Sequence, residues 1–400
     1  MRLSTTQIFQ QGISAILDQQ SRLSQAQQQV STGKRINSPS DDPVGSARVI
    51  DIGEQIAIAE QYERNAGLAV NQLGLEENAL VGVENILQRV RELTVQANND
   101  TLSPENRESI AVEIRTRLDE LVALANSKDA NGDYLFAGFQ KASQPFSLNN
   151  AVVSYNGDQG QTFLQVGPQV QVPVNDSGAE VFQLIDTGNG VFAVTDDPGN
   201  TGTGIVGATS EEGVFIEDTY TLTFTQLLPD DPITYQVTGA VSGPVATGTY
   251  NPGDSISFNG AVLALDGEPA DGDSFVIAPA GRQDLFSTLD RLATALESDN
   301  GSPLGRAQLH NEVNRQLNNL DQALEKIVSV RARVGTRLNN IESQSQLNQG
   351  FILQMQQARS DIEDVDLIEA VSQLNFQAIS LQAAQQAYVQ VQGLSLFNLL

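Results

Sequence analysis

The sequence predicts an α+β multidomain rod, in which long antiparallel coiled-coil helices from both termini carry an inserted all-β outer domain. Near each end of the 400-residue chain, apolar residues recur at alternating steps of three and four. That spacing is typical of a coiled-coil seam, which needs a partner helix to cover it. Between Lys141 and Arg282 the pattern changes to short β-rich runs separated by glycine and proline. The two ends can therefore cover each other, or cover other copies of the chain.

The first thirty residues carry the shorter seam. Its predicted positions are Ile13, Ile16, Gln20, Leu23, Gln27 and Val30. The segment is rich in glutamine, which suits a helix but offers little apolar area for packing. We therefore expect this helix to be marginally stable until neighbouring helices pack on it.

Prolines mark the starts of the later helices. Pro43, Pro104 and Pro303 each follow an Asp or Ser, whose side chain accepts bonds from the free amides of a first turn. A third helix is predicted over 103–128. The helix from Pro43 has two apolar stripes, which predict packing on two sides. One stripe comprises Val49, Ile52, Ile56, Ala59, Glu63, Ala66, Val70, Leu73, Glu77, Leu80, Glu84 and Leu87; the other comprises Leu75, Ala79, Val83, Ile86, Val90 and Leu93.

The central stretch predicts an all-β insertion. It holds 17 of the 49 acidic residues and no Lys or Arg, so we expect its surface to be solvated and to face outward. The runs expected to form strands are 151–155, 162–166, 170–174, 190–195, 220–226, 233–238, 255–258 and 274–277.

The longest seam follows the insertion. A short helix is expected over 285–296, and a helix from Pro303 to about Ser360 would be on the order of 80 Å long. Arg331, Ser345 and Asn348 interrupt its apolar seam; either they fix the register of a partner helix, or the seam faces solvent there. The seam positions are Val313, Leu317, Leu320, Leu324, Ile327, Arg331, Val334, Leu338, Ile341, Ser345, Asn348, Ile352 and Met355.

Breaks at 37–43 and 361–366 divide each end into an inner and an outer helical segment. We predict three domains on this basis. Residues 1–40 with 361–400 form an inner terminal coiled-coil domain, and residues 41–141 with 282–360 form a long-helix rod domain. Residues 142–281 form the β-rich outward-facing insertion, as one or two subdomains.

Composition excludes several classes of function. The net charge of −27 repels nucleic acid and anionic membrane surfaces, so neither is expected as a partner. The absence of cysteine excludes disulfides and thiolate metal sites, and a single histidine excludes a two-histidine zinc site. His310 is expected to be solvent-exposed or a contact residue. No apolar run is long enough to cross a bilayer, and the start lacks a cleavable secretory signal.

Four acidic motifs are read as turns and caps. Asp129-x-Asn131-Gly132-Asp133 lacks the glycine and glutamate spacing of a calcium loop, so an Asn-Gly turn is favoured. Asp41-Asp42 before Pro43 favours helix capping over a catalytic pair. The runs at 271–273 and 196–199 are typical of strand connections. No catalytic residue, metal site or cofactor is expected.

Several motifs resemble the flagellar hook-associated protein 3 family, the hook–filament junction proteins of the flagellin superfamily. The resemblance covers roughly residues 1–165 and 255–400. The motifs that carry it are MRLSTTQIFQ at the start, STGKRINSPSDDPVGSAR ending at Arg48, ANGDYLFAGFQ from Ala130, SQPF from Ser143, SYNGDQG from Ser154, GDSFVIAPA from Gly272, RARVGTRLNNIES from Arg331 and the terminal SLFNLL.

The resemblance implies an inner coiled coil of both termini, a shell of long helices and an outward β insertion. It also implies an extracellular location on the bacterial flagellum, reached unfolded through the flagellar secretion channel. The expected partners are other copies of the chain, a neighbouring hook-associated protein, flagellin and an export chaperone. An assembly role by packing of terminal helices follows, and no enzymatic activity is expected.

We expect the assembly interface to be apolar residues of the inner helices. These are Ile13, Ile16, Leu23, Val30, Leu374, Leu381, Tyr388, Leu394, Leu396 and Phe397. Two alternatives remain open: a flagellin that forms the filament itself, and a secreted coiled-coil protein whose β insertion binds a ligand.

Overall fold

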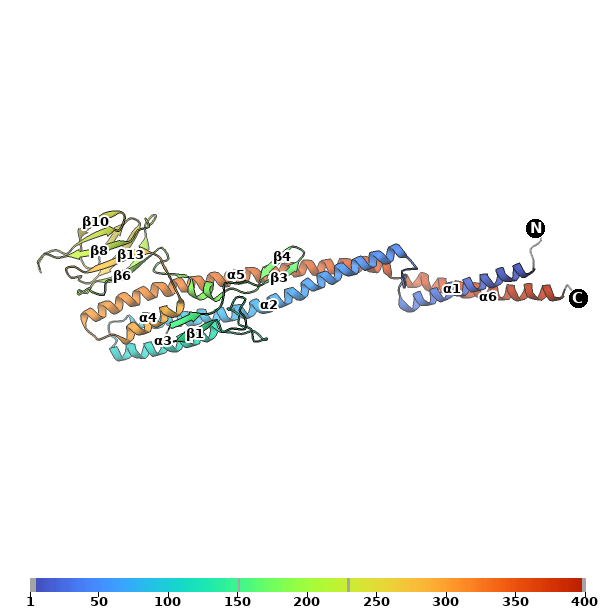
Figure 1. The fold of residues 1–400 in the computed structure, drawn as a ribbon, viewed down its shortest axis with the longest axis horizontal. Helices are drawn as coiled ribbons and strands as arrows, with labels where there is room; N and C mark the ends of the chain where they lie inside the picture. The colour runs from blue at the N-terminus through green and yellow to red at the C-terminus, as the bar shows by residue number, and fades with distance from the viewer. Residues whose placement is uncertain (1–4, 150–151, 229–230, 398–400) are drawn as a thin grey trace. The chain divides into compact units, whose positions relative to one another are not determined.

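The computed structural model describes residues 5–149, 152–228 and 231–397 (Figure 1). Long helices from both ends of the chain and central antiparallel sheets confirm the predicted fold class. The chain separates into two compact units. The first comprises 1–65, 166–168 and 343–400, and the second comprises 66–165 and 169–342.

The helices begin where the prolines predict. The described residues form six α-helices, which are α1 (Thr5–Thr32), α2 (Pro43–Ala97), α3 (Pro104–Ala125), α4 (Leu285–Glu297), α5 (Pro303–Glu363) and α6 (Leu367–Phe397). Side chains cap the first turns: Gly45 N donates to Asp42 Oδ1 at 2.9 Å, and Gly305 N donates to Ser302 Oγ at 3.0 Å. Ser103 likewise accepts from Asn106 N, which confirms capping at all three proline starts.

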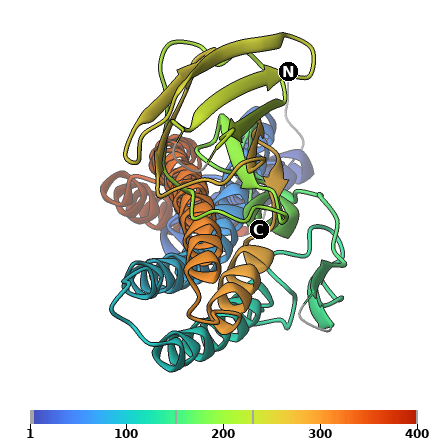
Figure 2. The same ribbon diagram turned by 90° about the vertical axis from the view of Figure 1, so that its left-hand side faces the viewer.

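In the second unit, helices α3 and α4 lie side by side, as both views show (Figures 1 and 2). The predicted seam of α5 is buried there at Val313, Leu320, Ile327 and Val334. The second stripe of α2 is also buried apart from Leu75, which is 39% exposed. The first stripe is buried or partly buried apart from Val70, which is 42% exposed, so the two stripes confirm that α2 packs on more than one side.

The polar residues in the seams face one another across the helix pair. In the second unit, Arg331 forms ion pairs with Glu77 and Glu84 of α2. In the first unit, Ser345 Oγ donates to Glu63 Oε2 at 2.7 Å and Asn348 Nδ2 donates to Glu63 Oε1 at 3.1 Å. The open question is therefore decided: these positions contact a partner helix, and a shift in register would separate each charged or polar group from its partner.

The insertion contains two antiparallel sheets. One has strand order β10-β9-β8-β13-β6 and the other β11-β12-β7; shorter pairs are β1-β2, β3-β4 and β14-β5. The bounds are β1 Phe146–Asn149, β2 Val152–Tyr155, β3 Phe163–Gly167, β4 Val170–Pro173, β5 Ile185–Asp186, β6 Phe192–Asp196, β7 Ile205–Glu211, β8 Tyr220–Thr225, β9 Thr234–Gly239, β10 Gly243–Thr249, β11 Ser255–Phe258, β12 Ala261–Asp266, β13 Ser274–Pro279 and β14 Arg282–Gln283.

Six strands have no counterpart among the predicted runs. Among them, β7 and β10 contain glycine, and β10 also contains Pro244 beside a break in register, features that weaken a strand signal in the sequence. A short π-helix at Ala179–Gln183 was also not predicted. These strands are stabilised by packing against their neighbouring strands, and the local sequence does not reveal those neighbours.

The two sheets share one hydrophobic core, so residues 192–277 behave as one β domain. Its buried members come from both sheets and include Phe192, Val206, Tyr220, Leu222, Phe224, Val237, Ile256, Leu263, Phe275 and Ile277. Residues nearer the start of the insertion pack elsewhere. The ring of Phe146 lies 5.1 Å from that of Phe286 on α4 and 5.4 Å from that of Phe182, so this part joins the helices.

Asparagines of α5 hold the β domain on its helix. Asn311 accepts from Val206 N at 2.7 Å and donates to Gly204 O at 3.0 Å, while Asn314 donates to Val206 O at 2.9 Å. Asn319 accepts from Gly188 N at 2.8 Å, in the segment just before the β domain. Each amide satisfies a backbone group that the sheets leave unpaired.

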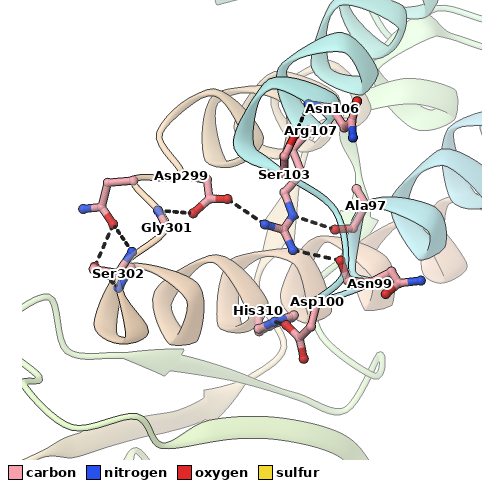
Figure 3. Close-up of polar contacts among 12 residues, drawn as sticks. Ala97, Asn99, Asp100, Ser103, Asn106, Arg107, Asp299, Gly301, Ser302 and His310 are labelled. Carbon is pink, nitrogen blue, oxygen red and sulfur yellow. Dashed lines mark hydrogen bonds and ion pairs between the residues drawn. The ribbon is translucent and has the colours of Figure 1, made fainter.

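Two polar clusters lie at the α2–α3 turn (Figure 3). His310 is 8% exposed and contacts Asn98 Oδ1 at 2.6 Å and Asp100 Oδ1 at 2.7 Å, so it is a contact residue and is not on the open surface. Arg107 is fully buried and pairs with Asp299 at 2.7 Å. Both clusters join the α2–α3 turn to residues before or within α5.

A buried carboxyl on α2 predicts a pH-dependent stability. Burial raises the pKa of Glu76 well above its usual value, and the nearby Asp176 carboxylate adds to the rise. Glu76 Oε2 has no hydrogen-bond partner among the described residues. A raised folded-state pKa means that the contribution of Glu76 is fully present below its unfolded pKa and is lost as pH rises through its folded pKa.

Glu76→Gln should therefore leave the melting temperature unchanged near pH 4 and raise it at pH 8. Glutamine keeps the shape of the protonated carboxyl and cannot ionise. Thermal unfolding followed by circular dichroism between pH 4 and pH 8 measures the difference. Glu54→Gln is the matched control, since Glu54 is exposed on the same helix. A pH-independent difference for Glu76→Gln would contradict this account.

Candidate assembly interface

Helices α1 and α6 pair in antiparallel orientation within the first unit. Residues near the start of α1 meet residues near the end of α6: the rings of Phe9 and Tyr388 lie 6.1 Å apart. Further along, Gln19 Nε2 donates to Gln377 O at 3.4 Å. The two termini of the chain therefore cover each other along one face.

At every second position, the residue of α1 that faces α6 is the one just before the predicted residue. Ile16, Leu23 and Val30 are partly buried as predicted, but Gly12, Gln19 and Ala26 replace Ile13, Gln20 and Gln27 on the covered face. Small residues allow the close approach: a Cβ atom at Gly12 would lie 2.8 Å from the Tyr388 ring. Packing against α6 determines which residues of α1 are covered, whereas the apolar pattern alone favoured Ile13 over Gly12.

The predicted interface residues occupy three kinds of place. Ile16, Leu23, Val30, Leu374, Leu381 and Tyr388 are partly buried between α1 and α6. Ile13 is 46% exposed and lies outside the covered face. Leu394, Leu396 and Phe397 lie in the last turns of α6, where the structure describes the helix but not its side chains.

A polar clasp joins the two helix breaks, 33–42 and 361–366. Arg35 N donates to Glu363 O at 2.7 Å, and Val365 N donates to Gly33 O at 3.0 Å. Lys34 Nζ lies 2.5 Å from Glu363 Oε1. Gly33 has a φ of +72°, which favours glycine and lets the chain reverse after α1. The clasp therefore holds together the two segments that precede α2 and α6.

Capping residues define both sides of the clasp. Asp41 Oδ2 accepts from Asn37 N at 3.1 Å and Ser38 N at 2.9 Å, so the Asp41-Asp42 pair orders the turn and starts the helix as predicted. Asp366 Oδ1 accepts from Ile368 N at 2.9 Å at the start of α6. These carboxylates are occupied by backbone amides.

The pair α1–α6 leaves a second apolar surface uncovered, and Ile13 is the predicted residue that lies on it. Its other large exposed members are Leu17 on α1 and Leu367, Ile368, Val371, Phe376, Ile379 and Val389 on α6. Helix α6 carries apolar residues around most of its circumference, and such a helix is normally buried on all sides. This all-round pattern is the sequence signal that would have identified the second surface.

The acidic motifs act as turns. Asp129 Oδ1 accepts from Asn131 N at 2.8 Å and Asp133 N at 3.0 Å, and Gly132 has a φ of +88°, a conformation that favours glycine. Asp273 binds backbone amides of 201, 202 and 270. Over the described ranges, no three His, Cys, Asp or Glu side chains converge as metal ligands. No described helix is long and apolar enough to span a bilayer.

Comparisons with known proteins point to flagellar proteins. Family models match over 3–141, the bacterial flagellin N-terminal helical region, and over 317–400, the bacterial flagellin C-terminal helical region. Flagellar hook-associated protein 3 of Escherichia coli (strain K12) is 29% identical over 399 residues, 100% of this chain and 99% of that protein. The solved flagellar hook associated protein-3 from Legionella pneumophila is 36% identical with a TM-score of 0.75, covering 78% of this chain and 98% of that one.

Flagellin matches a smaller part of the chain. Phase 1 flagellin of Salmonella naestved is 42% identical, but over 113 residues, which are 28% of this chain and 22% of that protein. The similarity to hook-associated proteins therefore extends through the long helices and the β insertion, whereas the similarity to this flagellin is local.

Proposed function

Because the chain belongs to the family of flagellar hook-associated protein 3, we propose that it is a structural component of the bacterial flagellum that joins hook-associated proteins to the flagellin filament. The observation that carries this function is the full-length match to hook-associated proteins, against a match to flagellin over 28% of the chain. The chain's relation to flagellin lies in its terminal helices, which both groups share.

Packing of the terminal helices is the proposed mechanism. In the single chain, α1 and α6 cover one face of each other and leave Leu17, Phe376 and Ile379 exposed. Burying apolar surface of this kind contributes roughly 25 cal/mol per Å². That gain offsets the conformational entropy lost when the helices become fixed against neighbouring subunits. The partly buried residues Ile16, Leu23, Leu374 and Leu381 hold the pair, and the exposed residues meet neighbours.

The proposed partners are other copies of the chain, a neighbouring hook-associated protein, flagellin and an export chaperone. The protein acts by assembly and not by catalysis. Its location is extracellular, reached through the flagellar secretion channel. The division into inner, rod and outward domains at 1–40 with 361–400, 41–141 with 282–360, and 142–281 remains part of this proposal.

Immunogold labelling of isolated flagella distinguishes this function from that of a filament subunit. We expect a single labelled band at the hook end of each filament, because a junction protein occupies one short zone. Antibodies raised to the β insertion suit the test, since that region lies outside both flagellin family-model matches. Labelling along the whole filament would instead identify a flagellin.

A further inference from the structure

An apolar groove lies on the first unit, away from the α1–α6 surface. It has a volume of about 460 Å³ and is lined by Ile58, Ala59 and Tyr62 of α2, Leu347 and Phe351 of α5, and Pro168. Leu347 is 68% exposed and Phe351 is 40% exposed. Apolar side chains rarely gather around an open groove unless something fills it.

Hydrogen bonds hold the floor of this groove in place. Asn348 is buried, donates to Val166 O at 2.9 Å and to Glu63 Oε1 at 3.1 Å, and accepts from Gln344 at 2.9 Å. A Cβ atom at Gly167 would lie 2.9 Å from Gln344, so the chain before Pro168 packs tightly on α5. The groove is therefore preformed, which lowers the entropic cost of filling it.

Among the described residues of the second unit, Phe139 and Phe163 are the aromatic side chains that are more than half exposed, and Phe139 is the more exposed of the two. Leu135, Phe136 and Ala137 are buried, but Phe139 in the same loop is 66% exposed. Its loop is rigid, because Asp158 Oδ1 accepts from Phe139 N at 2.9 Å and from Gly160 N at 2.7 Å. A rigid exposed aromatic residue is typical of the anchors that dominate protein interfaces.

The Phe139 loop is held in this position by glycines. Gly138 has a φ of +70°, and a Cβ atom there would lie 2.2 Å from Asp158 Oδ1. A Cβ atom at Gly160 would lie 2.2 Å from the Phe139 ring, so the ring rests on the backbone of Gly160. The NGDYLFAGFQ motif thus builds a fixed support for an exposed ring, a role that the folding of the unit alone does not require.

One cation near Phe139 is complementary to acidic residues near the groove, while the Asp158 carboxylate in the Phe139 loop is already bound by backbone amides. Lys141 follows Phe139 by two residues, and Asp51 and Glu54 precede the groove on α2. Between Arg48 and Arg64, α2 carries only acidic charged residues, and between Glu342 and Arg359 α5 carries none. Opposite charges beside an apolar contact favour its correct orientation.

We propose that Phe139 of one copy of this chain inserts into the apolar groove of a neighbouring copy, between α2 and α5. The contact joins two different surfaces of the same chain, so it is heterologous and can repeat from copy to copy. It rests on the proposed function, since it assigns a subunit–subunit contact within the assembled junction. Lys141 then lies beside Asp51 or Glu54 of the neighbour.

The absence of cysteine from the chain makes cross-linking a direct test. Gln140 lies next to Phe139, and Gln55 lines the groove, so each can become cysteine without removing either partner of the contact. Cells expressing Gln140→Cys and Gln55→Cys copies together would supply isolated flagella, which are treated with a short bis-maleimide and immunoblotted. We expect cross-linked dimers from the mixed flagella and none from either variant alone.

Adding Phe139→Ala to the Gln140→Cys copy should lower the dimer yield about tenfold or more, as expected for loss of an interface anchor. Val152→Ala is the matched control, because Val152 is also 66% exposed and lies in the same unit. It should leave the yield unchanged. The melting temperature of each purified variant should equal that of the parent, because these side chains are exposed.

Two results would overturn the contact while leaving the proposed function intact. One is a normal immunogold band at the hook end with no cross-linked dimer. The other is a dimer yield that Phe139→Ala does not reduce. A missing band would overturn the proposed function, and this inference with it.

Discussion

Deletion of residues 394–400 should give a soluble, folded monomer that cannot support filament growth, and cells carrying it should be non-motile. The deleted segment is Leu-Ser-Leu-Phe-Asn-Leu-Leu, which is apolar and without charged side chains. The contacts that hold each unit lie elsewhere: the clasp between the helix breaks and the seams of α2 with α5 do not include it. Its removal should therefore reduce the apolar area that packs against neighbouring subunits, while both units stay folded.

Swimming in soft agar and electron microscopy of the hooks measure the effect. The circular dichroism spectrum and melting temperature of the purified deletion variant provide the control for folding. A second variant, Phe376→Asp with Ile379→Asp, tests the exposed face of α6, where both side chains are more than 60% exposed. It should reduce the number of hooks that carry filaments. Normal motility of the deletion variant would refute the assembly role of the terminal helices.

Replacing Arg107 by alanine should lower the free energy of unfolding by about 3–5 kcal/mol, because it leaves a buried carboxylate without its partner. The side chains of Arg107 and Asp299 are fully buried and 2.7 Å apart. Arg107 also donates to Ala97 O at 3.0 Å and to Asn99 O at 2.9 Å, which ties the end of α2 to α3 (Figure 3). The substitution therefore removes two hydrogen bonds to backbone carbonyls and the ion pair with Asp299 together.

Urea denaturation followed by circular dichroism measures this loss. Arg91→Ala is the matched control: Arg91 pairs with Asp321 at 2.6 Å, but both side chains are more than 40% exposed. Water screens an exposed pair, so its removal should cost much less. Equal losses for Arg107→Ala and Arg91→Ala would show that burial does not determine the strength of these pairs.

The loss in free energy of unfolding caused by Arg107→Ala should also depend on pH. Burial alone would raise the pKa of the Asp299 carboxyl, but the Gly301 amide and the Arg107 guanidinium outweigh it and hold the pKa below its usual value. A lowered folded-state pKa means that Asp299 contributes stability above its unfolded pKa of about 3.9 and loses it as pH falls through the folded value. The difference in free energy of unfolding between the parent and Arg107→Ala should therefore become smaller below about pH 4.

The sequence predicted the long helices well because their signals are local or periodic. Pro43, Pro104 and Pro303 each stand at the first residue of a helix, after a capping Asp or Ser. The α5 seam is buried at every seventh residue from Val313 to Asn348. A period of 3.5 over so many residues has one physical explanation, which is a partner helix.

The candidate interface was predicted less completely. In α1 the apolar pattern selected Ile13, whereas the structure places Gly12 against Tyr388 and leaves Ile13 exposed. Apolarity ranks isoleucine above glycine, but close packing of two helices depends on the shape of the partner. The groove between α2 and α5 depends on Pro168, which is far from either helix in the sequence. No local pattern could have brought these three segments together.

The sequence by itself determined the helical ends, the acidic β-rich middle, the helix starts and the membership in a flagellar family. These properties depend on residue type and spacing, which are written along the chain. Only the tertiary structure decided which polar seam residues meet, how residues 142–185 divide between the helices and the β domain, and which apolar side chains remain exposed. Those properties depend on distances between segments remote in sequence, because burial and hydrogen bonding are set by neighbours in space.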